Sequence, residues 1–359
     1  MLARKAILNL KPYKPGKPIE EVKRELGLRD VIKMASNENP LGPSPKALAA
    51  IKKHLADINR YPESGCFYLR QALSKRLKVM PNQLIFGNGS DELIILALRA
   101  FVGEGDEVVV AAPTFLIYEI ASQVQGAKIK KVPTRYFKYD LKAMSQAVTK
   151  NTKIVFIANP DNPNSTYVAR HELEAFLKDL PESVIVFIDE AYFDFVAEKD
   201  YPNGMDYVSR NKVIATRSFS KSYGLAGLRI GYGVSDPDII KCMDSVREPF
   251  NVNLLAQVAA CAALKDKKFL AKTKRVIEAG RGFFYSEFKK LGLRYIPSVT
   301  NFVLFEVGKN ADQVSKRLLK KGVIVRNMKA WGMDTFIRVT VGKEKENRRF
   351  IKELKKAIA

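Results

Sequence analysis

The most informative stretch of this chain is residues 213–234, which read Val-Ile-Ala-Thr-Arg-Ser-Phe-Ser-Lys-Ser-Tyr-Gly-Leu-Ala-Gly-Leu-Arg-Ile-Gly-Tyr-Gly-Val. Its apolar ends, residues 213–215 and 230–234, are typical of buried strands, and the glycines between and within them are typical of a turn. The pattern therefore predicts that Lys221 lies in a turn between two strands.

Three polar side chains flank this lysine in the sequence. Ser218 and Ser220 stand just before Lys221, and Arg229 follows it, so two hydroxyls and a guanidinium can hold a dianionic phosphate beside the amine. A lysine that acts as a nucleophile needs a lowered pKa, which cationic or desolvating surroundings supply. The alternative interpretation is a surface lysine in an ordinary glycine-rich turn.

A regular alternation of strands and helices begins at residue 83. The predicted strands, 83–86, 107–112, 153–158 and 184–188, are apolar without polar alternation, which favours coverage on both faces. This predicts an α/β fold with a mostly parallel central sheet and helices on both faces. Each strand ends in polar residues, and ligands bind beyond the carboxyl ends of such strands, so one pocket can receive them all. Helices are predicted over residues 19–26, 45–55, 67–77 and 171–180.

A glycine-rich segment follows the first of these strands. Residues 87–92 read Gly-Asn-Gly-Ser-Asp-Glu and open a predicted helix that runs to about Phe101. The amides of Ser90 and Asp91 at the start of this helix form a potential phosphate site. The segment is neither a dinucleotide-binding fingerprint nor a Walker A loop.

The pattern of residues 218–231, Ser-x-Ser-Lys followed by Gly-Leu-Arg-x-Gly, resembles the lysine segment of fold-type-I aminotransferases, which use pyridoxal 5′-phosphate. The resemblance is closest to the histidinol-phosphate aminotransferase family, and the motifs match that family in order along nearly the whole chain. It implies that Lys221 binds the cofactor covalently. The other residues that it implies contact the cofactor are Ser90, Asp91, Phe115, Asn162, Asp189, Tyr192, Ser218, Ser220, Arg229 and Tyr61.

The resemblance gives several of these residues a chemical role. Asp189 is implied to pair with the protonated pyridine nitrogen, and Asn162 and Tyr192 to reach the phenolic oxygen of the cofactor. Phe115 is implied to stack on the cofactor ring; taken alone, it is better explained as a core aromatic. Asp189 and Glu190 adjoin in an extended segment and should point to opposite sides, which argues against a paired-carboxylate site.

The resemblance also implies a substrate site and a homodimer with shared active sites. Tyr61 is implied to contact the cofactor phosphate of a partner subunit. The chain departs from the family at Asn164 and Ser165, which replace Thr-Gly, and at Phe115, where tyrosine is common. The implied substrate-binding residues are Tyr13, Asn37, Arg326 and Arg338; without the resemblance, the two arginines are explained by ordinary surface pairing.

The pattern changes beyond residue 247. A long helical region, 254–291, precedes strands 300–306 and 336–341, whose apolar and polar residues alternate as in a half-exposed sheet. This predicts a second, smaller α+β domain. The predicted domains are an N-terminal arm over residues 1–35, a large cofactor-binding domain over 45–246, and a small domain of 36–44 and 247–359.

Length and composition limit the class of protein. The chain has 359 residues, of which 47% are hydrophobic, enough for a full core and more than one domain. Its net charge of +23 suggests the hypothesis of nucleic-acid binding. Basic residues are mixed with acids along the whole chain, however, so we expect no nucleic-acid partner. The same charge is compatible with steering an anionic substrate.

The cysteines and the first residues of the sequence indicate the cellular compartment in which we expect the protein. Cys66, Cys242 and Cys261 are too few and too scattered for a disulfide framework or a zinc site, and no metal is expected. No run approaches the length of a membrane span, and the first residues lack the features of a signal peptide. The expected location is the cytoplasm, without membrane attachment.

The activity that the resemblance implies is reversible transamination between glutamate or 2-oxoglutarate and histidinol phosphate or imidazole-acetol phosphate, in histidine biosynthesis. Three alternatives stay open at this point. One is an aromatic or broad-specificity aminotransferase, which uses the same residues. The others are a threonine-phosphate decarboxylase and a nucleic-acid-binding protein built on a retired enzyme fold.

Overall fold

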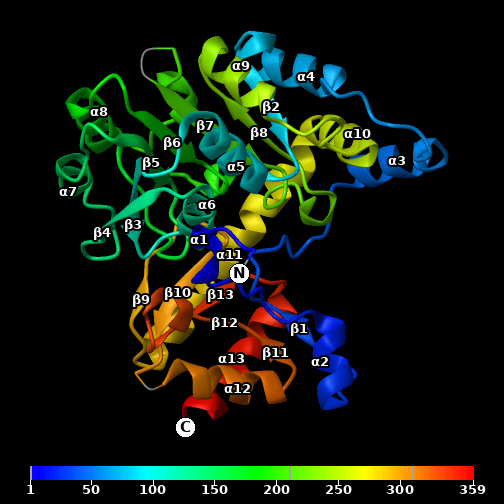
Figure 1. Ribbon diagram of the computed structural model, residues 1–359. Helices are drawn as coiled ribbons and strands as arrows, with labels where there is room; N and C mark the ends of the chain where they lie inside the picture. Colours follow the sequence, from blue (N-terminus) through cyan, green and yellow to red (C-terminus); the bar gives the residue numbers. More distant parts are fainter. Residues whose placement is uncertain (1, 210–211, 309) are drawn as a thin grey trace.

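The computed structural model describes residues 2–209, 212–308 and 310–359. Within these residues the chain forms a large unit around a seven-stranded sheet and a smaller unit around a four-stranded sheet. Figure 1 shows the large unit in the upper part of the view and the smaller unit below it, with helix α11 (Lys267–Lys290) running between them. The short helix α1 (Lys5–Leu8) lies near the junction of the two units.

The large sheet combines parallel strands with one antiparallel strand. In the described part of the chain its strands lie in the order β2 (Leu84–Gly87), β8 (Gly231–Val234), β7 (Val213–Ser218), β6 (Ile185–Asp189), β5 (Thr152–Ala158), β3 (Glu107–Ala112) and β4 (Lys128–Pro133). Strand β8 pairs antiparallel with both of its neighbours, and the remaining pairs are parallel. The predicted α/β fold with a mostly parallel sheet is therefore confirmed.

The interior strands of this sheet are covered on both faces. All residues of the interior strands β6 and β8 are buried, and so are those of the edge strand β2, as expected for apolar runs without polar alternation. Strand β4 was not predicted, because its lysines interrupt the apolar pattern; it is an edge strand, where lysines are common. The helices around the sheet are α3 (Pro45–Lys53), α4 (Phe67–Leu77), α5 (Ser90–Phe101), α6 (Leu116–Gln125), α7 (Leu141–Gln146), α8 (Arg170–Asp179), α9 (Pro237–Ser245) and α10 (Leu254–Leu264).

The smaller unit has an antiparallel sheet and a short parallel pair. The sheet order is β12 (Arg326–Asn327), β13 (Phe336–Thr340), β10 (Phe302–Glu306) and β9 (Tyr295–Ile296), and β1 (Ile32–Lys33) pairs with β11 (Val323–Ile324). Its helices are α2 (Ile19–Leu26), α12 (Ala311–Lys320) and α13 (Glu344–Ile358). Strand β1 thus joins the N-terminal segment to the smaller unit.

The prediction of a half-exposed sheet in this unit is wrong. Every residue of β13 is buried, and so is β10 apart from Glu306. Leu304 of β10 and Phe336 of β13 belong to an apolar cluster with Trp331, against which Leu116 of α6 packs. The second face of the sheet therefore lies against the large unit instead of solvent.

The predicted helical region 254–291 is two helices. Asp266 separates the two helices, because its carboxylate accepts a hydrogen bond from the backbone N–H of Phe269 at 3.2 Å and so caps the start of α11. Ala256 and Ala259 of α10 lie in the core of the large unit. We therefore propose that the division between the units falls at α11, later than residue 247.

Candidate active site

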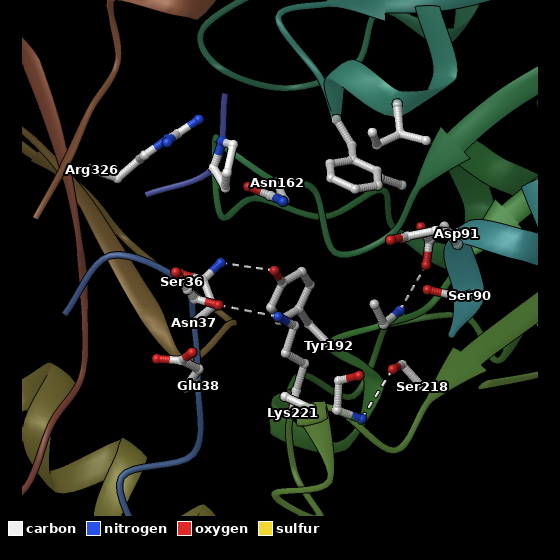
Figure 2. Close-up of a pocket in the computed structure, with 18 of the residues that line it drawn as sticks. Ser36, Asn37, Glu38, Ser90, Asp91, Asn162, Tyr192, Ser218, Lys221 and Arg326 are labelled. Carbon is white, nitrogen blue, oxygen red and sulfur yellow. Dashed lines mark hydrogen bonds between the residues drawn. The ribbon is translucent and has the colours of Figure 1, made fainter. Parts of the chain in front are cut away.

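A cavity of about 330 Å³ lies at the carboxyl ends of the large sheet's parallel strands, next to the smaller unit. Figure 2 shows Ser90 and Asp91 on one side of it, Arg326 on the other, and Lys221 with Tyr192 between them. The sequence-predicted residues that line the cavity are Tyr13, Asn37, Ser90, Asp91, Phe115, Asn162, Asp189, Tyr192, Ser218, Ser220, Lys221, Arg229, Arg326 and Arg338. The predicted gathering of polar strand ends in one pocket is thus what the structure shows.

Lys221 lies in the turn between β7 and β8, as predicted. Its Nζ donates to the backbone oxygen of Ser36 at 3.3 Å. Gly224 has a φ of +70°, and a β-carbon there would lie 2.0 Å from the backbone oxygen of Gly42. A glycine is required for this contact, which packs the lysine turn directly against the segment that follows Ser36.

The environment of Lys221 favours the neutral amine. Burial lowers the pKa of Lys221 to about 8, and the positive charge of Arg338 contributes in the same direction. Because the neutral form is the nucleophile, a lower pKa places more of this amine in a reactive state near neutral pH.

We predict that cyanate carbamylates Lys221 in the cofactor-free protein with a half-maximal rate near pH 8. The rate rises with pH because only the neutral amine reacts, and a pKa of about 8 leaves about a tenth of it neutral at pH 7. Mass spectrometry of the peptide that contains Lys221 measures this rate. Arg338→Met should move the midpoint upward, and a wild-type midpoint at pH 10 or above would contradict the prediction.

One side of the cavity is an anion site. Ser90 begins α5, so the positive end of the helix faces this region, and Ser218 and Ser220 add two hydroxyls. Arg229 donates to the carboxylate of Asp91 at 3.3 Å. Gly89 has a φ of +85°, and a β-carbon there would lie 2.4 Å from Nη2 of Arg229, so glycine leaves the room that the guanidinium occupies.

Asp189 ends β6 as a buried carboxylate on the cavity wall. It accepts hydrogen bonds from the Tyr118 hydroxyl at 2.9 Å and from the backbone N–H of Ala191 at 3.1 Å. Burial raises the pKa of Asp189 to about 6, so a cation placed beside it would be stabilised. Glu190 instead pairs with Arg217 at 2.9 Å, so the two adjacent carboxylates have different partners, as predicted.

Two hydrogen-bond donors face the space above Lys221. The hydroxyl of Tyr192 accepts from Nδ2 of Asn37 at 2.8 Å, so its own proton is available to the cavity. The side-chain oxygen of Asn162 accepts from Nη1 of Arg338, which orients the Asn162 amide so that its NH₂ group can donate. Arg338 also donates to the backbone oxygen of Ala35 at 3.0 Å.

The opposite side of the cavity carries the second anion site. The guanidinium carbon of Arg326 lies 5.5 Å from the ring centre of Tyr13, and its Nη2 donates to the backbone oxygen of Lys14 at 2.8 Å. The Nε atoms of Arg326 and Arg338 are buried without a hydrogen-bond partner in residues 2–209, 212–308 and 310–359. Two unsatisfied guanidinium donors indicate space for an anionic ligand.

Tyr61 lies outside the cavity of its own chain. Its side chain is 83% exposed and stacks on Phe250, with ring centres 4.7 Å apart. It lines a separate surface groove together with Ile58 and Leu254. Its predicted contact with the cofactor of a partner subunit stays a prediction.

Sequence reasoning missed two groups that the structure places in the site. Tyr118 has a sequence signal: it follows Phe115 by three residues at the start of α6, and that spacing puts both on one helix face. Ser36 has none, because it contacts Lys221 through its backbone oxygen, which any residue carries.

Comparison with known families identifies this arrangement. The family model described as aminotransferase class I and II matches residues 29–354, which is most of the chain. The chain belongs to this family. It is therefore a pyridoxal-phosphate-dependent aminotransferase with the fold-type-I architecture.

The relatives of this aminotransferase cover nearly its whole length. Histidinol-phosphate aminotransferase of Moorella thermoacetica is 51% identical over 99% of this chain and 93% of the relative. Histidinol-phosphate aminotransferase 2 of Carboxydothermus hydrogenoformans is 45% identical over 99% and 98% of the two chains. The crystal structure of histidinol-phosphate aminotransferase from Sinorhizobium meliloti, in complex with pyridoxal 5′-phosphate, superposes with a TM-score of 0.92 at 29% identity, covering 99% of this chain and 97% of that one.

The cavity of the aminotransferase fits its cofactor. A phosphate has the amides at the start of α5, the hydroxyls of Ser218 and Ser220 and the guanidinium of Arg229, and a protonated ring nitrogen has the buried carboxylate of Asp189. Lys221 lies between them with an amine suited to covalent attachment. Among the helices in the described residues, none has the length and apolar character to cross a bilayer.

Proposed function

We propose that this aminotransferase interconverts histidinol phosphate and imidazole-acetol phosphate, using glutamate and 2-oxoglutarate as the second pair, in histidine biosynthesis. The supporting observation is that the Nε donors of Arg326 and Arg338 on the cavity lining are buried without a partner in the described residues. Of these two arginines, Arg326 lies on the side opposite Ser90 (Figure 2). A substrate with anionic character satisfies them. The names of the relatives, at up to 51% identity, support the same substrate.

When bound, the cofactor supplies an electron-withdrawing ring that stabilises negative charge on the amine-bearing carbon of the substrate. Asp189 holds the ring nitrogen in its protonated form, because a buried carboxylate favours a neighbouring cation. Tyr192 and Asn162 donate hydrogen bonds to the phenolic oxygen. Ser218, Ser220, Arg229 and the amides of Ser90 and Asp91 would hold the phosphate, and Phe115, which lines the same cavity, would pack against the ring.

Lys221 carries the proton transfer. Its Nζ, with a pKa of about 8, would accept the proton from the amine-bearing carbon of the substrate and deliver it to C4′ of the cofactor during the exchange of the amino group. Arg338 binds the carboxylate of glutamate or 2-oxoglutarate, and Arg326 binds the distal anion of each substrate in turn. Because both substrates use one cavity, the reaction follows a ping-pong cycle.

We propose a homodimer for the assembly. Tyr61 is exposed beside Ile58, which is itself 64% exposed, so this surface presents apolar area that a second copy can cover. In this arrangement Tyr61 reaches the cofactor phosphate of the partner subunit. We place the reaction in the cytoplasm, where the thiols of Cys66, Cys242 and Cys261 stay reduced.

A single-turnover absorption experiment tests the substrate. The holoenzyme is mixed with histidinol phosphate, glutamate, phenylalanine or threonine phosphate without a keto acid, and conversion of the cofactor to its amino form and release of carbon dioxide are followed. Fast conversion by the first two and slow conversion by phenylalanine is expected. Equal rates with phenylalanine would indicate an aromatic or broad-specificity aminotransferase, and release of carbon dioxide from threonine phosphate would indicate the decarboxylase.

We predict that Arg326→Ala lowers kcat/KM for the phosphate substrate more than for glutamate. Loss of a charge-assisted contact with a dianion should lower kcat/KM for histidinol phosphate by about 30- to 100-fold, with a smaller effect on the singly charged side chain of glutamate. Steady-state kinetics with both substrates measures the loss of kcat/KM for each. Arg294→Ala, which removes an exposed arginine paired with Glu306, is the matched control. Equal losses for both substrates would make Arg326 structural or a general anion anchor.

A further inference from the structure

Trp331 connects the two units at the cavity. It is the single tryptophan of the chain, it ends the 3₁₀ turn Lys329–Trp331 of the smaller unit, and it is 9% exposed. Its indole Nε1 donates to the backbone oxygen of Thr114 in the large unit at 2.8 Å. Thr114 immediately precedes Phe115 on the cavity wall. The indole therefore fixes the loop that presents Phe115.

The ring of Trp331 also contacts Arg326. The guanidinium carbon lies 5.1 Å from the ring centre of Trp331 and 5.5 Å from that of Tyr13, so the positive charge has an aromatic ring within cation–π distance on two sides. Arg326 lies in the two-residue strand β12, and its long side chain has many rotamers, whose restriction costs entropy when it binds a ligand in one geometry. The two rings restrict those rotamers and leave the unpaired Nε for a ligand.

The Thr114 loop continues this connection towards Asn162. The Thr114 hydroxyl donates to the carboxylate of Asp161 at 3.2 Å, and Asp161 is buried directly before Asn162. A chain of contacts thus runs from Arg326 through Trp331 and Thr114 to the segment of Asn162.

We infer that Trp331 is a positioning residue for the distal anion of the substrate, acting by holding Arg326 and by fixing that arginine relative to the Phe115 loop. The inference rests on the proposed function, in which Arg326 binds that anion. The competing explanation is that Trp331 only fills the apolar cluster that contains Met328 and Phe336. The two explanations differ for substrates that lack a distal anion, because lost packing affects all substrates alike.

Three variants of the full-length holoenzyme separate these explanations. Trp331→Leu removes the ring and the N–H; we expect KM for histidinol phosphate to rise about tenfold, with kcat nearly unchanged and phenylalanine turnover little affected. Trp331→Phe keeps an aromatic face for Arg326 and loses only the N–H to Thr114, so its KM should rise by about threefold, less than in Trp331→Leu. Phe336→Leu removes another ring of the same cluster, one that contacts Phe137, and should leave the ratio of the two substrates unchanged.

Fluorescence gives a readout that does not depend on turnover. Trp331 is the only tryptophan, so emission excited at the indole band reports on this position alone. Titrating the holoenzyme with inorganic phosphate should change the emission saturably, because an anion at Arg326 alters the charge beside the indole. The change should be lost in Arg326→Ala.

The outcomes identify which claim fails. If Arg326→Ala itself leaves KM for histidinol phosphate unchanged, the proposed anion role of Arg326 fails. If Arg326→Ala raises that KM but Trp331→Leu raises KM equally for histidinol phosphate and phenylalanine, or not at all, only the inference about Trp331 is overturned. A phosphate response of the indole that persists in Arg326→Ala would show that the anion does not bind at Arg326, and so would overturn the proposed anion role of that arginine.

Discussion

Replacing Lys221 with alanine is expected to abolish transamination while leaving cofactor binding measurable. In the proposed function the amine of Lys221 carries the proton, and loss of a positioned general base costs up to about 10⁴-fold in rate. The contacts assigned to the cofactor phosphate come from Arg229, Ser218 and the start of α5, so they persist in the variant. Rapid-quench kinetics measures the rate, and equilibrium dialysis with pyridoxal phosphate measures the binding.

Two controls make this result specific. Lys221→Arg keeps a positive charge but offers no neutral amine at any working pH, so it should be as inactive as the alanine variant. Lys33→Ala removes a lysine that pairs with Glu38 at the cavity rim, at 2.9 Å, and should retain most activity. Turnover by Lys221→Ala within tenfold of wild type would remove the assignment of Lys221 as the catalytic residue.

Asp189→Asn is expected to lower activity and to stabilise the cofactor-free protein, two effects of opposite sign from one change. Without the carboxylate, the ring nitrogen of the cofactor loses the charge that keeps it protonated, and removal of one preorganised electrostatic partner typically costs 10²- to 10³-fold in kcat. Stopped-flow kinetics with glutamate measures this loss.

The stability effect follows from the pKa of Asp189. Burial raises this pKa from 3.8 to about 6, so the folded protein binds a proton more tightly than the unfolded chain. The stability from this group is present below about pH 4 and is lost as pH rises to about 6, by roughly 3 kcal/mol at 1.36 kcal/mol per pKa unit. Asparagine does not ionise, so the free energy of unfolding of the variant should exceed that of the wild type at pH 8 but not at pH 4.

Thermal unfolding of both cofactor-free proteins at the two pH values tests this. Tyr118→Phe is the matched control: it removes the hydroxyl that donates to Asp189 at 2.9 Å but keeps the carboxylate, so it should not gain stability at pH 8. A pH-independent difference between wild type and Asp189→Asn would show that the carboxylate is not desolvated in the cofactor-free protein.

Sequence reasoning succeeded where local pattern and long-range packing agree. Helices α2 and α4 and strand β3 have the predicted bounds, because each combines a strong local signal with burial of its apolar side. The cavity residues of the large unit were found because the carboxyl ends of parallel strands meet at one edge. The turn of Lys221 was found because its glycines and flanking strands leave few alternatives.

It failed where a side chain's surroundings come from the other unit. The alternation in β13 indicates one solvated face, but Phe336 on that strand packs in the cluster of Trp331, and Arg338 lines the cavity. The same limit hid Trp331 itself, since its partner Thr114 lies 217 residues away in the chain. A sequence pattern reports that a residue is amphipathic or apolar and does not report which distant surface covers it.

The contact between Gly224 and Gly42 has a consequence for altering this enzyme. A library that randomises residues 37–43 to accept new substrates would include the Gly42 backbone against which the lysine turn rests, and so would shift the reactive amine together with this side of the cavity. Substrate scope and reactivity are therefore not independent engineering variables on this side. Variation confined to Tyr13 and the residues around Arg326, on the far side of the cavity, leaves that backbone contact intact.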